Sequence, residues 1–433
     1  MNLRFKKNEC VFFIAVFIVS IKYINGTDIG NKLANVTSLL WIIYSFGQKK
    51  KYEFKRIARV NLRLVLAPII AMVVYTCILW LIKPPSGAGT TMSYFTRLLS
   101  TNTYLVLQFL FVFSAFEMFG ERTIEIIYQG LMANYTFMSI VPALIFCGPI
   151  EIAKYLFLSD SVRGGVNAYL EVHDLTFALG ILFIYYFVVG FRHRTNKNIK
   201  RLIFIGIYIF LGYKRIEMAA IFLVLLYYYI VDINFKNLKR KTAVITGLVA
   251  TLSLIFIGAI YSGLLDYLAL EFGINFNYRL DTWAYWANRS SFSLAYPGLG
   301  TNFVDKDTYL MRLSSGIIQD GHVLVAGMHS DLFKKYVELG FIPFCSWIIY
   351  ILYGKIIYLN KRFGKVAADV YLLITLYIVV LYLTDNVYNY AICNACYFVV
   401  TMVTCLNAVY REQANIDISV IGRKTSFELG KEM

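Results

Sequence analysis

The stretch YRLDTWAYWANRSSFSLAYPGLG, residues 278–300, belongs to the one long polar interval of the sequence, which runs from about Leu265 to Gly340. Apolar runs occupy most of the chain on either side of it. A connection of this length inside a membrane bundle is either functional or disordered. Aromatic residues such as Trp283 and Trp286 give it more apolar surface than a solvated linker carries. We therefore expect short amphipathic helices at a membrane surface.

Composition indicates the class of protein. The 433 residues are 59% hydrophobic and 16% charged, whereas a soluble protein of this size needs more polar surface. The net charge of +16 comes from short basic runs between apolar segments, which is typical of cytoplasmic loops. No basic face is interleaved with aromatic residues, as nucleic-acid binding would require. The sequence predicts an integral membrane protein and no nucleic-acid partner.

Apolar segments long enough to cross a bilayer recur along the chain. A membrane-spanning helix needs about 20 mostly apolar residues, with about 17 tolerated. We predict an all-α polytopic bundle of about 12 transmembrane helices, forming a single integral membrane domain over residues 1–433. The first is expected to be a retained span, because no small-x-small cleavage site follows it. The spans are centred on residues 10–25, 33–47, 61–82, 101–119, 131–157, 174–191, 202–213, 217–232, 243–264, 338–354, 367–384 and 389–409.

Basic residues predict the orientation of this bundle. If the N-terminus is cytoplasmic, the cytoplasmic segments hold most of the 42 Lys and Arg residues, as the positive-inside rule requires. We expect both termini inside, a cytoplasmic tail over residues 410–433 and a large extracytoplasmic loop over residues 265–336.

The seven cysteines all fall in or beside apolar segments, so they do not form a disulfide framework. Cys393 and Cys396 are interpreted as a packed pair rather than a metal or redox site. We expect no cofactor and no metal site.

Four cationic residues are expected at the outer membrane surface. Lys214 and Arg215 lie between two short apolar runs, and Arg279 and Arg289 lie on or beside an aromatic amphipathic stretch. Because a planar guanidinium matches phosphate oxygens, arginines that converge here would form a pyrophosphate clamp. The alternative for Lys214 and Arg215 is snorkelling, or pairing with Glu217.

His329 immediately precedes a predicted helix that begins near Ser330. A helix N-terminus binds anions, and histidine is the most frequent general base near neutral pH. Asp331 and Glu338 are seven residues apart and therefore share a helical face, from which they could orient a sugar or the base. The alternative for His329 is a surface histidine at a helix cap.

Three groups of residues resemble motifs of the Wzy-type polysaccharide polymerases and the related WaaL-type O-antigen ligases: Arg215 after a short span; Arg279-Leu280-x-x-Trp283 and Pro297-x-x-Gly300 in a large outer loop; and His329-Ser330-x-Leu332 with Glu338-x-Gly340 entering the next span. The similarity covers about residues 200–355 in motif and the whole chain in topology. Lys214 stands where serine is common in the family, and Ser330 where asparagine is common.

The resemblance implies a metal-independent, inverting glycosyltransferase that builds a surface polysaccharide, such as O-antigen, capsule or exopolysaccharide. Polyprenyl-pyrophosphate-linked oligosaccharides would be both donor and acceptor, at the extracytoplasmic face of the bacterial cytoplasmic (inner) membrane. Membrane lipids, a flippase and a chain-length regulator are the other implied partners. The implied catalytic residues are His329, Arg279 and Arg215, and the implied substrate-binding residues are Lys214, Arg289, Asp331, Glu338, Trp283 and Trp286.

Two alternatives stay open. An O-antigen ligase shares the donor chemistry and differs in its acceptor, which a single sequence does not disclose. A flippase or transporter for lipid-linked oligosaccharides would carry charged or broken helices near the bilayer midplane, usually with symmetry between its halves. The sequence has little of either feature.

Overall fold

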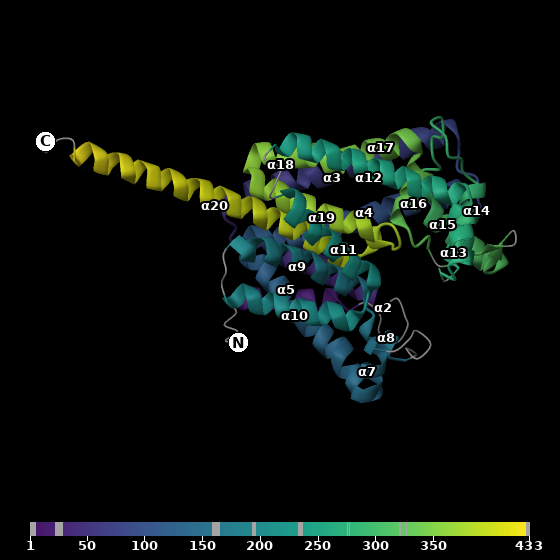
Figure 1. The fold of residues 1–433 in the computed structure, drawn as a ribbon, viewed down its shortest axis with the longest axis horizontal. Helices are drawn as coiled ribbons and strands as arrows, with labels where there is room; N and C mark the ends of the chain where they lie inside the picture. Colours follow the sequence, from purple (N-terminus) through teal and green to yellow (C-terminus); the bar gives the residue numbers. More distant parts are fainter. Residues whose placement is uncertain are drawn as a thin grey trace.

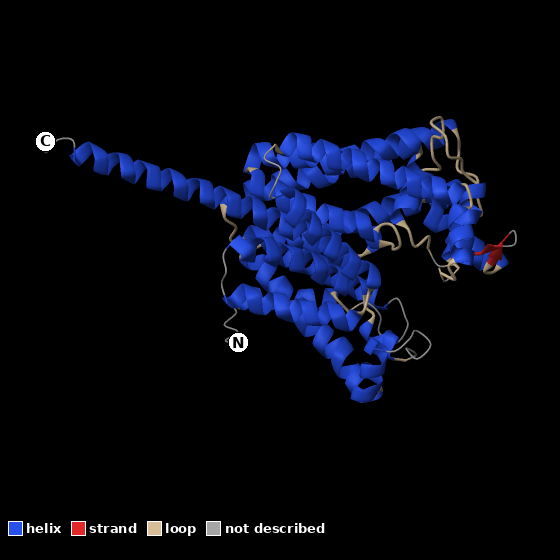
Figure 2. Ribbon diagram, in the orientation of Figure 1, coloured by secondary structure: helices blue, strands red, loops and turns tan. Residues whose placement is uncertain are grey.

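Helices make up nearly all of the regular structure (Figure 2). The computed structural model describes residues 6–21, 29–157, 165–192, 196–232, 237–274, 276, 278–319, 322–325 and 327–429. Within these ranges the exception is one short antiparallel hairpin, β1 (Ile318–Gln319) and β2 (His322–Val323), with Ile318 opposite Val323. The predicted all-α class is confirmed apart from this hairpin.

Six helices of the described part of the chain are long and apolar enough to cross a membrane. Two of them continue through a π-helical turn. The six are α3 (Tyr52–Ile82), α4 (Thr91–Phe119), α5–η1–α6 (Arg122–Phe146), α12 (Leu238–Tyr261), α17–η4–α18 (Phe341–Phe363) and the first part of α20 (Ala391–Tyr410).

The remaining predicted spans also coincide with helices, but these are shorter or less apolar. A helix of 17 residues is about 26 Å long, slightly less than the hydrocarbon core of a bilayer. These helices are α1 (Lys7–Val19), α2 (Ile29–Phe46), α9 (His173–Arg192), α10 (Asn196–Gly212), α11 (Arg215–Tyr227) with η3 (Tyr228–Asp232), and α19 (Lys365–Leu381).

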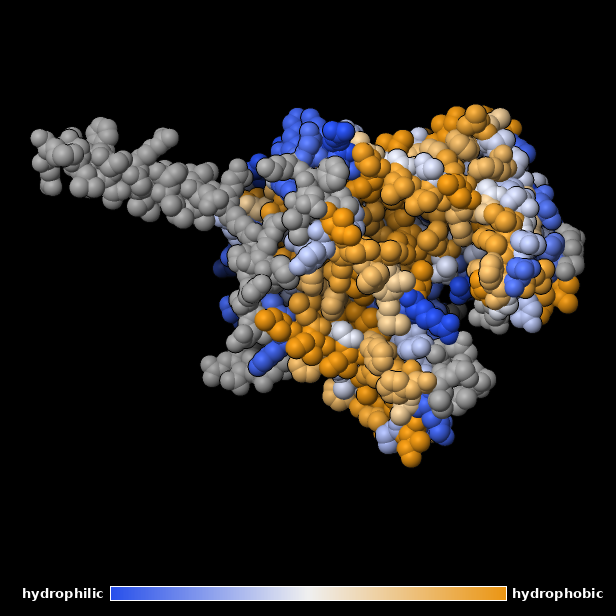
Figure 3. All heavy atoms as spheres, viewed as in Figure 1, coloured by the Kyte–Doolittle hydropathy of each residue, from blue (hydrophilic) through white to orange (hydrophobic). Residues whose placement is uncertain are grey.

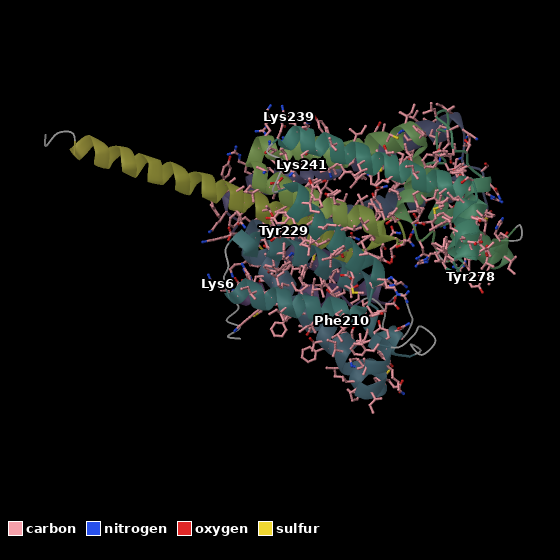
Figure 4. All side chains as sticks on the ribbon, in the orientation of Figure 1. Lys6, Phe210, Tyr229, Lys239, Lys241 and Tyr278 are labelled. Atoms are coloured by element: carbon pink, nitrogen blue, oxygen red, sulfur yellow. The ribbon has the colours of Figure 1, made fainter. Side chains whose placement is uncertain are left out.

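The long helices run roughly side by side, and both termini lie at the same end of the bundle (Figure 1). We call this the termini end; Lys6, Lys239 and Lys241 lie there, whereas Tyr278 lies at the opposite end (Figure 4). Hydrophobic atoms cover the flank between the two ends (Figure 3). The opposite end, which we call the cap end, carries four short helices: α13 (Leu264–Glu271), α14 (Arg279–Asn288), α15 (Phe303–Ser315) and α16 (Asp331–Leu339).

Several predicted boundaries differ from the structure. The predicted span 131–157 is instead a helix from Arg122 to Phe146, because Gly148 takes a left-handed backbone (φ 80°) and begins a separate helix. That helix, α7 (Gly148–Phe157), packs with α8 (Val166–Leu170) at the side of the bundle. The first predicted span ends early, at Val19, and its residues 22–25 lie outside the described residues. The predicted tail continues α20 as helix to Leu429, and residues 430–433 are not described.

Three helices, α9, α19 and α20, form the centre of the bundle and pack against one another. In the span of α20, 78% of the residues are buried, compared with 28% in the span of α12 at the periphery. Their cap ends are joined by hydrogen bonds. The backbone N–H of Cys393 donates to Asp174 Oδ1 (2.9 Å), and Tyr377 Oη donates to the carbonyl of Phe177 (3.1 Å). Residues at these helix ends are therefore held by the most buried part of the protein.

The Pro297-x-x-Gly300 motif is a junction between the cap and two long helices. The N–H of Leu299 donates to the carbonyl of Val337 (3.0 Å), and that of Gly300 donates to the carbonyl of Glu338 (2.8 Å). From α3, Trp80 Nε1 donates to the carbonyl of Leu299 (2.8 Å). The motif therefore attaches the cap to α3 and to the start of α17.

Gly340 completes this junction, with φ 79° and ψ 177°, a region open almost only to glycine. A Cβ on Gly340 would also overlap the backbone of Pro297 and Tyr296. We expect Gly340→Ala to destabilise the protein by about 2–6 kcal/mol, the sum of backbone strain and overpacking.

Gly364 provides a matched control, because its φ of 82° and ψ of 176° are nearly the same while a Cβ there would meet nothing within 4 Å. Gly364→Ala should therefore lose only the strain component. The thermal stability of both purified variants in detergent would measure the difference. Equal losses would contradict a close contact at Gly340.

Candidate functional site

Ionisable side chains from separate parts of the chain gather at the cap end. They come from the starts of α9, α11 and α14, from the segment before α16, and from the connection between α19 and α20. In Figure 3 hydrophilic atoms border a notch between the cap and the helices below it. We call the following residues the polar cluster: Glu171, His173, Lys214, Arg279, His329, Asp385 and Tyr390.

His173 lies at the centre of a chain of contacts. Its Nδ1 is 3.4 Å from Asp385 Oδ2, and its Nε2 is 3.6 Å from Glu171 Oε1. Lys214 Nζ lies 2.5 Å from the same Glu171 oxygen, and Tyr390 Oη donates to Asp385 Oδ1 (2.5 Å). Lys214 therefore pairs with Glu171, whereas the sequence suggested Glu217 as its partner. These contacts connect the cap ends of all three central helices to the start of α11.

Both acidic members of the polar cluster are ionised near neutral pH. Burial alone would raise the pKa of Glu171, but a hydrogen bond from His173 and the charge of Lys214 outweigh it and lower that pKa to about 2. Burial would likewise raise the pKa of Asp385, and contacts with His173 and Tyr390 hold it well below its usual range. The polar cluster thus combines fixed negative charges with cations.

His329 is half-buried, and its Nδ1 is buried with no hydrogen-bond partner among the described residues. Burial lowers the pKa of His329, and the nearby charge of Arg279 lowers it further, against an opposing effect of Asp385. The imidazole is therefore neutral at pH 7 and able to accept a proton. Arg279 and Lys214 both act on this pKa, so the structure brings the predicted histidine close to two of the predicted cations.

The backbone is strained at one residue of the polar cluster and at two residues directly before its members. Four non-glycine residues of the described part of the chain have a left-handed φ, and one of them is His329 (48°). Tyr213 (47°) directly precedes Lys214, and Tyr278 (60°) directly precedes Arg279. Such conformations cost about 1–3 kcal/mol each and concentrate at functional sites. They are independent support for a site here, and no sequence signal indicates them.

Arg215 is the first residue of α11 and is exposed beside Lys214 at the cap end. Arg289 lies elsewhere. Its guanidinium stacks over the Tyr285 ring, 4.3 Å from the ring centroid, and lines a different cavity together with Lys83. Of the four predicted cations, Lys214, Arg215 and Arg279 therefore lie at or beside the polar cluster, and Arg289 lies at a different cavity.

Asp331 and Glu338 are buried with other charged residues of α16. Asp331 Oδ1 lies 2.9 Å from Lys334 Nζ, which also lies 3.2 Å from Asp305 Oδ2. The N–H of Tyr388 donates to Asp331 Oδ2 (2.6 Å). Because α16 is buried on every side, its charges must be satisfied internally. We assign Asp331 to anchoring α16 rather than to supporting His329, which corrects its predicted role. The carboxylate oxygens of Glu338 are buried and have no hydrogen-bond partner among the described residues, so the role of Glu338 stays a prediction.

The two predicted substrate-binding tryptophans are core residues. Trp283 is 1% exposed, and its Nε1 donates to the carbonyl of Met328 (2.7 Å), which positions the segment leading to His329. Trp286 is also 1% exposed and donates to Thr308 Oγ1 (3.2 Å). Neither ring has a face available to stack on a sugar.

A cavity of about 360 Å³ lies beside the polar cluster, lined by Glu171, His173 and Tyr390 together with Tyr169 and Asn134. Glu171, His173, Asp385 and Tyr390 were not predicted as site residues. Their sequence signal is modest: each lies at or beside the end of an apolar segment. Only the packing of α9 against α19 and α20 brings them together.

An apolar cavity opens between the long helices as well. It is lined from α3 by Met72, from α17 by Trp347, and from the connection after α19 by Tyr382 and Tyr388. The same connection carries Asp385, so this cavity approaches the polar cluster from the flank of the bundle.

No protein-family model matches the chain, and a search of curated proteins finds no match. The fold defines the class: a helical protein with a polar cluster at one end of its bundle and, in the part of the chain that the structure describes, six helices long and apolar enough to cross a membrane.

Proposed function

We propose that this protein is an inverting glycosyltransferase that polymerises polyprenyl-pyrophosphate-linked oligosaccharide repeat units at the outer face of the bacterial cytoplasmic membrane. The observation that carries the proposal is His329, whose buried Nδ1 has no hydrogen-bond partner among the described residues and whose pKa is lowered by the charges of Arg279 and Lys214. Arg279 and His329 are the residues to which the resemblance to Wzy-type polymerases assigns the phosphates and the acceptor.

The proposed topology has about 12 spans, cytoplasmic termini and an extracytoplasmic cap. It is supported by the helices, whose ends alternate between the termini end and the cap end (Figure 1). With single cysteines in a background free of the seven native ones, we expect Leu313→Cys to be labelled from outside intact cells and Arg240→Cys to be protected. Leu313 is 67% exposed in the cap, and Arg240 is exposed at the start of α12. The opposite labelling pattern would reverse the orientation.

In the proposed reaction, the acceptor hydroxyl oxygen attacks the anomeric carbon of the donor sugar while His329 takes the hydroxyl proton. The bond from the anomeric carbon to the phosphate oxygen breaks, and polyprenyl pyrophosphate leaves with the electron pair. Arg279, Arg215 and Lys214 stabilise the charge that develops on the leaving group. The polyprenyl chain would lie along the apolar cavity between the long helices.

The experiment that tests the function uses the purified protein in nanodiscs with a lipid-pyrophosphate repeat unit as its sole substrate. Polymer ladders on a gel are the expected result. Absence of a ladder, with transfer of glycan to a different acceptor, would favour the ligase. Transport of the same lipid across proteoliposomes, without any glycosidic bond being formed, would favour the flippase.

The pH dependence of turnover follows from the lowered pKa of His329. A base works only when it is neutral, so turnover should fall as the pH drops through this pKa, with a midpoint below 6.5. Asp385→Asn removes a carboxylate that raises the pKa of His329, so the midpoint should move to lower pH. The other groups that act on the pKa of His329, which are Arg279, His173 and Lys214, remain in that variant. Turnover that increases on acidification would instead make His329 a general acid.

A further inference from the structure

A second polar cavity, of about 370 Å³, lies between α4 and α15. One face of α15 lines it with Asp305, Thr308, Tyr309 and Arg312, at the three- and four-residue spacing of a helical face. Arg97 of α4 also lines it. Lys306 and the loop residues Gly327, Asn386 and Asn389 complete the lining. We call it the α4–α15 cavity.

The charged side chains that line the α4–α15 cavity are mostly positive. Arg97, Lys306 and Arg312 line it with a single carboxylate, that of Asp305, which is already 3.2 Å from Lys334 Nζ. The Nε atoms of Arg97 and Arg312 are buried and have no hydrogen-bond partner among the described residues. A buried donor left unpaired costs about 1–3 kcal/mol, more when the group is charged. An oxyanion in the cavity would satisfy both guanidinium groups.

The α4–α15 cavity adjoins the polar cluster. Gly327 precedes His329 by two residues, so their Cα atoms are at most about 8 Å apart. Asn386 directly follows Asp385. A Cβ on Gly327 would lie 2.8 Å from the Asn386 amide nitrogen, so the two loops pack tightly at this point. The loops that carry His329 and Asp385 therefore also form part of the wall of this cavity.

We propose that the α4–α15 cavity binds a saccharide through an oxyanion, a carboxylate or a phosphate, and that it holds the acceptor glycan with a hydroxyl group at His329. Arg97 and Arg312 bind the anion. The amides of Asn386 and Asn389 reach sugar hydroxyls, and the Tyr309 ring, 58% exposed, provides an apolar face for a sugar. The acceptor role rests on the proposed function, whereas anion binding stands without it.

Calorimetric titration of the full-length protein in nanodiscs tests the anion site with three probes: D-glucuronate, inorganic phosphate and D-glucose. We expect the anions to bind and the neutral sugar to bind at least about tenfold more weakly, since a charge-assisted pair contributes about 1.5–3 kcal/mol. Arg97→Gln and Arg312→Gln should each weaken anion binding about tenfold. Arg362→Gln, an exposed arginine near the termini end of α18, is the matched control and should bind as wild type does.

A preference for glucuronate identifies an acidic sugar as the ligand, and a preference for phosphate identifies a phosphate group of the acceptor. Glucose bound as tightly as glucuronate, or anion binding unchanged in both Gln variants, overturns the site. Because a Gln variant can fail to fold, Arg312→Lys, which keeps the charge but loses the fork, is measured as well and should show intermediate affinity. Arg279→Gln removes the proposed donor clamp, so the anion site in the α4–α15 cavity should be the one that remains. If anions bind as expected but the Gln variants polymerise at the wild-type rate, the site stands and the acceptor role falls.

Discussion

Replacing His329 with alanine is expected to lower turnover about a hundredfold or more, because general base catalysis contributes about 10²–10⁴ in rate. His329 is the site residue whose ring nitrogen is buried and free of a hydrogen-bond partner among the described residues. Donor binding should largely survive, since the cations at Arg279 and Lys214 remain. Polymer ladders from the purified variant would measure the rate, and titration with the lipid-linked donor would measure binding.

The left-handed backbone at His329 calls for a second variant. Asparagine tolerates this conformation but cannot act as a base, so His329→Asn should lose the same activity without added strain. His322→Ala is the control, because His322 lies in the hairpin and packs near Tyr285, outside the polar cluster. Ladders of unchanged rate and length from both His329 variants would exclude the imidazole from the proton transfer.

Arg279→Lys should reduce turnover by about tenfold to a hundredfold, although the positive charge is kept. A guanidinium donates two parallel hydrogen bonds to phosphate oxygens, whereas an ammonium group acts as a point charge. Loss of one charge-assisted hydrogen bond amounts to about 1.5–3 kcal/mol, which corresponds to this range in rate. The expected abundance in the membrane is normal, because Arg279 is half-exposed at the start of α14.

Arg362→Lys controls for the general effect of exchanging an exposed arginine. Arg215→Lys should resemble Arg279→Lys if both side chains contact the leaving pyrophosphate. If Arg215→Lys and Arg279→Lys both gave the wild-type polymer yield, Arg215 and Arg279 would have no role in phosphate binding.

Much of the fold could be predicted from the sequence because membrane helices obey a local rule. A helix that crosses a bilayer satisfies its own backbone hydrogen bonds, so its position depends on a continuous apolar run. Six of the predicted spans accordingly coincide, in whole or in part, with helices long and apolar enough to cross a membrane, and the described parts of the others overlap helices that are shorter or less apolar. The prediction was wrong where a local backbone feature intervened. Left-handed Gly148 ends the helix that begins at Arg122, and hydropathy alone does not report a dihedral angle.

The site was predicted less completely. His329, Arg279 and Lys214 were predicted because each is a polar residue beside apolar or aromatic segments; the structure places them near one another, and their roles stay predictions. Trp283 was misjudged, because an aromatic residue in a polar interval suggests a surface and burial in the cap is not visible in the sequence. Asp331 was misjudged because spacing within α16 does not show that the helix is buried on every side, or that Asp305 of α15 also approaches Lys334, the partner of Asp331.

The sequence by itself determined the helical class, the positions of the apolar segments and the identity of the base and cations that we propose. These properties depend on local composition and on short motifs. Only the tertiary structure decided that Glu171, His173 and Asp385 lie beside these residues, and that Arg97 and Arg312 line the same second cavity. Such contacts join residues from distant parts of the chain, such as His173 and Asp385. They depend on which helices pack at the centre, a choice made by the fit of many side chains at once that no single segment encodes.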